Sequence, residues 1–176
     1  MDAASGQFRI SSGKKPAFFI VIIRFLVCNK SVRKTGKTAN ADAMIGRFEI
    51  TLRVEPEDID MLGHVSNIVY LRWIQDVAIA HWDTLAPQGE QEKLVWVVRR
   101  HEIDYKRPAM PGDTVIVRTW IGEAVRMAFD RHTEILRASD GRLLAQARTV
   151  WCPIDRKTGK PTDVSPEIRA LFSVSE

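Results

Sequence analysis

The stretch Asp58–Tyr70 reads DIDMLGHVSNIVY and marks the point where the chain enters its one long helix. Two aspartates and a glycine turn stand directly before an apolar pattern with helical spacing. A carboxylate just ahead of a helix N-terminus can act as a base or a nucleophile, and the unpaired amides of the first helical turn can polarise a carbonyl group. The stretch therefore predicts a reaction site led by Asp60 and Asn67.

The helix itself is predicted over Asn67–Leu85. Its apolar stripe is wide, which predicts a largely buried helix, and comprises Tyr70, Ile74, Val77, Ala78, His81, Trp82 and Leu85. Ser66 or Asn67 is the expected N-cap, with a side-chain oxygen that accepts from a first-turn amide. Pro87 and Gly89 are expected to end the helix, and the rest of the chain is expected to form strands.

Five strands are predicted. Arg47–Val54, Thr114–Ile121 and Met127–Ile135 alternate, Leu94–Tyr105 is rich in Val, Trp and Ile, and a further run covers Leu143–Cys152. A break at Gly122-Glu123 is expected between the third and fourth strands, and Ser139–Arg142 carries the Asp-Gly chemistry of a hairpin turn. This order predicts an α+β fold, an antiparallel sheet with one helix on a face.

One helix cannot cover five long strands, so the uncovered sheet surface and the apolar edges predict a second subunit, most simply in a symmetric dimer.

Charge and cysteine usage exclude several classes of function. Residues 1–43 carry eight basic and two acidic side chains, so the rest of the chain has a net charge of −2. A slightly acidic domain lacks the basic footprint of a nucleic-acid-binding protein. Cys28 and Cys152 have neither disulfide nor zinc spacing, and the four histidines are scattered, so we expect a cytoplasmic protein without a metal.

Residues 1–43 are predicted to be a disordered basic extension. The apolar run Ala17–Cys28 is too short to span a bilayer and contains Arg24. The preferred interpretation is an over-extended reading frame with Met44 as the working start; a signal peptide and an organelle-targeting segment are alternatives. The domain is then expected over 44–165, followed by a C-terminal tail with a short helix over 166–176.

The motif resembles one family. Its pattern is Asp-x-Asp-x-x-Gly-His-Val-x-Asn-x-x-Tyr, carried here by Asp58, Asp60, Gly63, His64, Val65, Asn67 and Tyr70. Over roughly 44–165 the chain resembles the 4-hydroxybenzoyl-CoA thioesterase-like acyl-CoA thioesterases of the hotdog fold; 104–108 and 111–113 add a weaker likeness. The resemblance implies a five-stranded sheet wrapped around the helix, and a homodimer or homotetramer with active sites at subunit interfaces.

The resemblance also implies roles for individual residues. Asp60 would be the catalytic carboxylate, as nucleophile or general base, and the amide of Asn67 would stabilise the oxyanion. His64 and the Asn67 side chain are weaker candidates for orienting substrate or water. Gly63, Val65 and Tyr70 would line the substrate site, and no cofactor is implied. Ile59 and Met61 depart from common members, which leaves the shape of the acyl pocket open.

Simpler interpretations stand beside these. Asp58 and Asp60 are common turn and cap residues, His64 is more often structural, and Tyr70 and Trp73 are typical core or interface residues.

The phosphates of CoA need cations. The candidates near strand ends or turns are Arg126, Arg156, Lys157 and Lys160, although ordinary turn chemistry is the preferred interpretation of the last three. The resemblance implies hydrolysis of an acyl-CoA to the free acid and CoA. The alternatives are an acyl-carrier-protein thioesterase, which would need a basic rim, and a non-catalytic acyl-CoA-binding protein.

Overall fold

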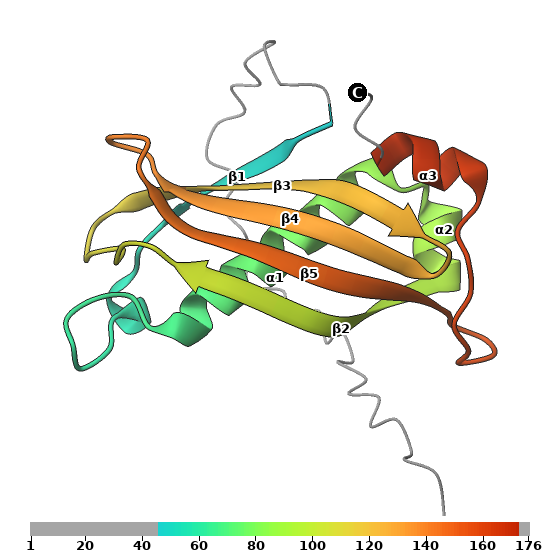
Figure 1. Cartoon of the computed structure of the whole chain (residues 1–176), viewed down its shortest axis with the longest axis horizontal. Coiled ribbons are helices and arrows are strands. Elements are labelled where there is room, and N and C mark those ends of the chain that lie inside the picture. Colours follow the sequence, from blue (N-terminus) through green and yellow to red (C-terminus); the bar gives the residue numbers. More distant parts are fainter. Residues whose placement is uncertain (1–45, 173–176) are drawn as a thin grey trace, which may run out of the picture.

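The structure, a computed structural model, describes residues 46–172 (Figure 1). The elements in chain order are β1 (Phe48–Arg53), the 3-10 turn η1 (Pro56–Asp58), α1 (Asn67–Leu85), α2 (Gln88–Lys93), β2 (Leu94–Tyr105), β3 (Thr114–Val125), β4 (Ala128–Arg137), β5 (Leu143–Asp155) and α3 (Pro166–Phe172). The expectations for residues 1–43 lie outside the described residues. Between 46 and 172 no helix is long and apolar enough to cross a membrane.

The five strands form one antiparallel sheet in the order β1-β3-β4-β5-β2, with α1 lying across one face (Figure 1). The α+β prediction is confirmed, and α1 and β2 have the predicted bounds. The β4–β5 hairpin forms as expected, with Gly141 at a φ of 68° in its turn. β1 and β2 are the two edge strands, of six and 12 residues.

Two apolar clusters fill the space between α1 and the sheet. The first surrounds the N-terminal half of α1, where Ile74 and Val77 are completely buried against Val115 and Val117 of β3. The second surrounds the C-terminal half of α1 and is covered by α3, whose Phe172 stacks on Trp82. Complete burial stabilises the folded state by about 1.5–3 kcal/mol for each such aliphatic side chain, so the helix stripe holds the fold together.

Three local predictions were wrong. The chain after Pro87, expected to form strands only, first forms the short helix α2, which has no buried residue and therefore no apolar stripe to predict it. The break at Gly122-Glu123 is a bulge inside β3, which continues to Val125. Leu85, expected on the buried stripe, is 39% exposed because it is the last residue of α1.

Ion pairs cover much of the outer face of the sheet. Arg118 contacts Glu49 and also Glu134, at 3.5 Å. Arg148 contacts Asp130 and, at 3.5 Å, Glu102. Such groups remain hydrated and gain little from burial. The expected second subunit is therefore better accommodated at a sheet edge than on this face.

A buried cation lies between the two apolar clusters. The guanidinium of Arg131 donates to Nδ1 of His81 at 3.0 Å and to the hydroxyl of Thr119 at 3.2 Å. Burial lowers the pKa of Arg131 to about 10; burial, followed by the charge of Arg131, lowers the pKa of His81 to about 3. His81 stacks on Phe48 and meets the edge of Phe172. A neutral imidazole thus replaces the carboxylate that usually accompanies a buried arginine.

Candidate active site

Residues 59–65 form a tight hairpin immediately before α1. Ile59 and Val65 make an isolated antiparallel bridge, and the amide of Asp60 donates to the carbonyl of His64 at 2.9 Å. The turn closes when the Gly63 amide donates to the Asp60 carbonyl at 3.0 Å. Gly63 has a φ of 77°, a conformation that favours glycine. The hairpin therefore brings Asp60, Gly63, His64 and Val65 together.

One of the two carboxylate oxygens of Asp60 is hydrogen-bonded within its own turn. Its Oδ1 accepts from the Leu62 amide at 2.8 Å, an Asx-turn bond, and lies 3.8 Å from Nδ1 of His64. No residue from 46 to 172 donates to Oδ2, and the side chain is 30% exposed. One oxygen thus orients the group while the other remains available to a substrate.

The N-terminus of α1 begins two residues after this hairpin. Ser66 is the N-cap, but no side chain caps the helix, so the predicted capping bond from Ser66 or Asn67 is absent. The reason is that Ser66 is tied through its backbone, where its amide donates to the Asp58 carbonyl at 2.9 Å. The Asn67 amide has no acceptor among the described residues. An uncapped amide at the positive end of a helix is suited to bind an oxyanion.

Asp58 has a different environment from Asp60. Its side chain is 2% exposed; it accepts from Arg72 at 2.5 Å and from the Glu55 amide at 3.0 Å. Both oxygens are therefore committed to joining η1 to the first turns of α1. Asp58 therefore has a structural role, and Asp60 is the aspartate of the pair with a carboxylate oxygen that accepts no hydrogen bond from residues 46–172.

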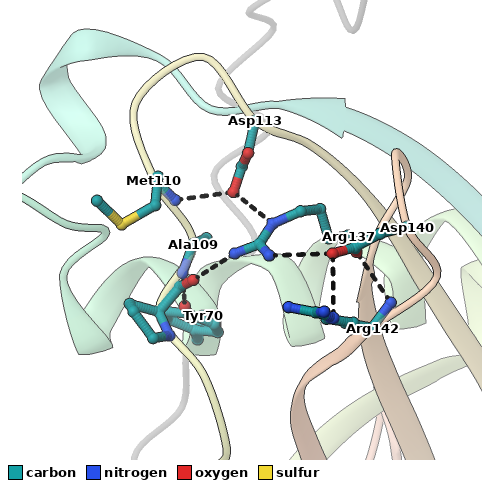
Figure 2. Close-up of polar contacts among 8 residues, drawn as sticks. Tyr70, Ala109, Met110, Asp113, Arg137, Asp140 and Arg142 are labelled. Atoms are coloured by element: carbon teal, nitrogen blue, oxygen red, sulfur yellow. Dashed lines mark hydrogen bonds and ion pairs between the residues drawn. The ribbon is translucent and has the colours of Figure 1, made fainter.

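Tyr70 lies in the core and supports the hairpin from behind. Its hydroxyl accepts from the Ala109 amide at 2.8 Å (Figure 2). The Ala109 carbonyl in turn accepts from the Val65 amide at 3.0 Å. Burial raises the pKa of the Tyr70 phenol. The ring also meets the edge of Tyr105, whose hydroxyl donates to the Asn67 carbonyl at 3.4 Å. Tyr70 thus touches the loop that holds the site, as a positioning residue.

The loop 106–113 is braced by residues that sequence reasoning did not select. Arg137 donates to the Pro108 carbonyl at 2.9 Å and to Asp113 at 3.0 Å, and Asp113 accepts from the Met110 amide at 2.9 Å (Figure 2). The family-like segment 111–113 was the signal for part of this brace, but Arg137 lies 24 residues beyond Asp113 and carries no local signal. The Asp60 hairpin is therefore anchored through a second loop to β4.

Arg126 and Lys157 do not join this group within one subunit. Arg126 lies in the β3–β4 turn with a φ of 52°, and Lys157 lies in the turn after β5. The 58–66 loop and the 155–160 turn occupy opposite ends of β2 in Figure 1.

No three histidine, cysteine or acidic side chains within 46–172 are placed to hold a metal ion.

Exposed apolar side chains surround the hairpin. Met61 is 98% exposed, and Leu62 and Ile68 are also largely exposed, as are Tyr105 and Met110 to a smaller extent. An exposed apolar patch of this kind usually marks a binding surface for a ligand or another protein. The Asp60 hairpin therefore lies at an open surface of the subunit, on the side of β2.

A five-stranded antiparallel sheet around one long helix, with a carboxylate turn at the helix N-terminus, defines a hotdog-fold protein of the thioesterase type. The model of the thioesterase-like superfamily matches residues 54–172, and the chain belongs to this family. The match covers both the Asp60 hairpin and α3.

Named relatives include enzymes for two kinds of thioester. The chloroplastic acyl-acyl-carrier-protein hydrolase FATB3 of Cuphea viscosissima is 30% identical over 73% of this chain and 33% of its own length. The long-chain acyl-CoA thioesterase FadM of Escherichia coli is 24% identical over 69% of this chain and 94% of its own length. The chain thus spans about a third of the plant relatives that it matches.

Solved structures show the same fold. A thioesterase from Thermus thermophilus complexed with coenzyme A and zinc is 26% identical, with a TM-score of 0.61 over 70% of this chain and 95% of that one. A 1,4-dihydroxy-2-naphthoyl-CoA thioesterase from Synechocystis is 22% identical, with a TM-score of 0.63 over 72% and 96%. The prediction of a hotdog thioesterase is confirmed at the level of family and fold.

Proposed function

We propose that the protein hydrolyses an acyl-CoA to the free acid and CoA, with Asp60 as the catalytic carboxylate and the Asn67 amide as the oxyanion donor. The observation that carries the proposal is the pairing of a carboxylate with one unengaged oxygen and an uncapped helix N-terminus in the same rigid segment. A thioester has a good leaving group, so a positioned carboxylate and a stabilised oxyanion are the main requirements.

The reaction adds one water molecule across the thioester. The water oxygen bonds to the carbonyl carbon, the carbon–sulfur bond breaks, and the proton that the water loses ends on the sulfur of CoA. Asp60 either removes this proton as a general base or attacks the carbon to form an anhydride that water opens. In both routes the carbonyl oxygen becomes negative near the Asn67 amide, where the dipole of α1 favours that charge.

The neighbouring residues have supporting roles in this proposal. His64, 3.8 Å from Asp60, orients the carboxylate or water, and Gly63 and Val65 shape the substrate surface of the hairpin. Tyr70 acts through Ala109, so its role is positioning rather than substrate contact. A cytoplasmic location, expected from the cysteine pattern, belongs to the same proposal.

A second copy of the chain completes the site in this proposal. β2 is an edge strand of 12 residues whose outer backbone groups pair with no strand between 46 and 172. A long free edge is a template for pairing with another strand. Tyr105, at the end of β2, contacts Asn67, so the exposed patch around Met61 continues this edge. We propose a homodimer through β2; the sheet geometry leaves a further pairing into a tetramer open.

Two alternatives remain for comparison. An acyl-carrier-protein thioesterase is favoured by the plant relatives, but the net charge of −2 outside residues 1–43 does not favour an acidic protein partner. A non-catalytic acyl-CoA binder is disfavoured by the intact Asp60 site. Short, long and aromatic acyl groups are all compatible with an exposed, open hairpin.

The test is hydrolysis of short, long and aromatic acyl-CoAs, followed by thiol release. We expect Asp60→Asn to lose at least about a hundredfold in kcat, the range for removal of an essential acid–base group. Asp83→Asn, at the opposite end of α1, is the matched control and should turn over normally. Wild type that hydrolyses no thioester but binds acyl-CoA would favour the non-catalytic alternative, and a fully active Asp60→Asn variant would exclude the proposed chemistry.

A further inference from the structure

The loop 106–113, which connects β2 to β3, is held by backbone hydrogen bonds at both ends. The Lys106 amide donates to the Leu144 carbonyl at 2.8 Å, and the Asp113 carbonyl accepts from the Val54 amide at 2.9 Å. The middle of the loop contains two prolines, at positions 108 and 111, which have no N–H group to donate. The middle of the loop therefore depends on side chains for its position.

One peptide group in the middle of this loop is hydrogen-bonded on both sides. This group, the 108–109 peptide, joins Pro108 to Ala109. Its oxygen accepts from Nη2 of Arg137 at 2.9 Å, and its N–H donates to the Tyr70 hydroxyl at 2.8 Å (Figure 2). Because a peptide group is planar, two bonds at its opposite ends fix its orientation. The guanidinium charge also polarises the group, which strengthens the bond that its N–H donates.

The carbonyl of Ala109 transmits this orientation to the Asp60 hairpin. Ala109 is completely buried, and its carbonyl accepts from the Val65 amide at 3.0 Å. Val65 pairs with Ile59 across the hairpin, and Asp60 is the residue that follows Ile59. A rotation of the 108–109 peptide would therefore shift the hairpin and the carboxylate that it carries.

Arg137 is itself fixed by two carboxylates. Its Nε donates to Asp113 at 3.0 Å, and its Nη1 donates to Asp140 at 3.4 Å. Each nitrogen of the guanidinium thus has its own acceptor, and the three acceptors come from Pro108, from the end of the loop and from the β4–β5 turn. The side chain of Arg137 is only 17% exposed. Lysine has a single nitrogen and cannot reproduce this planar arrangement of donors, so the position requires an arginine.

Arg142 provides a comparison within the same group of charges. Its Nε lies 3.4 Å from Asp140, the carboxylate that Arg137 also contacts (Figure 2). The side chain of Arg142 is 64% exposed, however, and it contacts no residue of the loop 106–113. Loss of Arg142 would therefore change the charge of the β4–β5 turn without moving the 108–109 peptide.

We infer that Arg137 is a positioning residue for the thioesterase reaction: it orients the 108–109 peptide and, through Ala109, holds Asp60 in place before α1. The inference rests on the proposed function. Arg137 touches no reacting atom, so it acts on the geometry of attack. A misplacement of about 1 Å can cost about a hundredfold in rate. Contacts between the substrate and the exposed apolar patch around Met61 are much less sensitive to such a shift, so kcat is affected and KM is not.

The first test measures kcat and KM for an acyl-CoA that the full-length wild type hydrolyses, with rates expressed per folded protein from urea unfolding. Arg137→Met should lower kcat about ten- to a hundredfold and leave KM within about twofold. Arg137→Lys should show the same pattern, because it keeps a charge beside Asp113 but not the fork, and it serves if Arg137→Met does not fold. Arg142→Ala is the matched control and should retain the wild-type kcat.

The second test asks whether Arg137 and Tyr70 act on the same peptide group. Once either bond is lost the 108–109 peptide is no longer fixed, so Tyr70→Phe/Arg137→Met should be about as slow as the slower single variant. Losses that multiply in the double variant would show independent actions and would contradict the inference.

The two tests separate the inference from the proposed function. An active wild type with an unaffected kcat in Arg137→Met and Arg137→Lys would overturn the inference alone, as would an equal loss of kcat in Arg142→Ala. A raised KM with an unchanged kcat would also overturn it, since it would assign Arg137 to substrate binding. A wild type without any thioesterase activity would refute the proposed function and the inference together.

Discussion

The buried pair of His81 and Arg131 makes the stability of the protein depend on acid in a defined way. Folding lowers the pKa of His81 from 6.5 to about 3, so the native state holds the imidazole neutral. Below pH 6.5 the unfolded chain binds a proton at this position that the folded chain does not. The stabilisation is therefore complete above pH 6.5 and is lost as the pH falls toward 3.

The magnitude follows from the shift. One proton corresponds to about 1.4 kcal/mol for each pH unit, so at pH 5 the contribution of His81 has fallen by about 2 kcal/mol. His81→Gln retains an acceptor for Arg131 but cannot titrate, so its stability should lack this part of the pH dependence.

The assay is urea unfolding of wild type and His81→Gln at pH 7, 6 and 5. Protein concentration must be constant, because association shifts apparent stability. Every other group is shared by the two proteins, so its contribution cancels in the difference. We expect the wild type to lose about 2 kcal/mol more than the variant between pH 7 and pH 5. Equal pH slopes for the two proteins would refute the reasoning.

Three substitutions test the local structure. Tyr70→Phe leaves the buried Ala109 amide without an acceptor, so it should cost about 1–3 kcal/mol of stability. It should also lower kcat, because it loosens the Asp60 hairpin. Thermal unfolding measures the first effect and thiol release the second, and an unchanged kcat would contradict a positioning role. Gly63→Ala should cost about 1–2 kcal/mol and reduce activity, because its φ of 77° is unfavourable for alanine although the space is open. Gly89→Ala lies in α2 with open space around it and should stabilise by about 0.5–1 kcal/mol in urea; destabilisation would show that α2 is not helical.

Local patterns predicted much of the fold. The helical stripe and its flanking residues were sufficient to define Asn67–Leu85, and richness in Val, Trp and Ile defined Leu94–Tyr105. Pro87 ends α1 as expected, but the following helix α2 was missed because none of its residues is buried and it carries no apolar stripe. Gly122 likewise looked like a break but lies in a bulge, which local composition alone does not distinguish from a turn.

The site was predictable only in part. The motif placed Asp60 and Gly63 in one turn because their spacing is short, but it could not show that Asp58 is buried against Arg72 or that Tyr70 points to Ala109. Those contacts depend on packing between segments 14 and 39 residues apart. The contact of His81 with Arg131, 50 residues away, could not be predicted from local periodicity for the same reason.

The backbone of Ala109 has a consequence for heat inactivation. Its amide is bound to Tyr70 in the core and its carbonyl to Val65 in the Asp60 hairpin, so a single residue joins this hairpin to the hydrophobic interior. Surface loops commonly open before the rest of a protein. The Asp60 hairpin should not open separately in this way, so heating should not produce a folded protein whose hairpin is locally unfolded. Activity and tertiary structure should disappear at the same temperature.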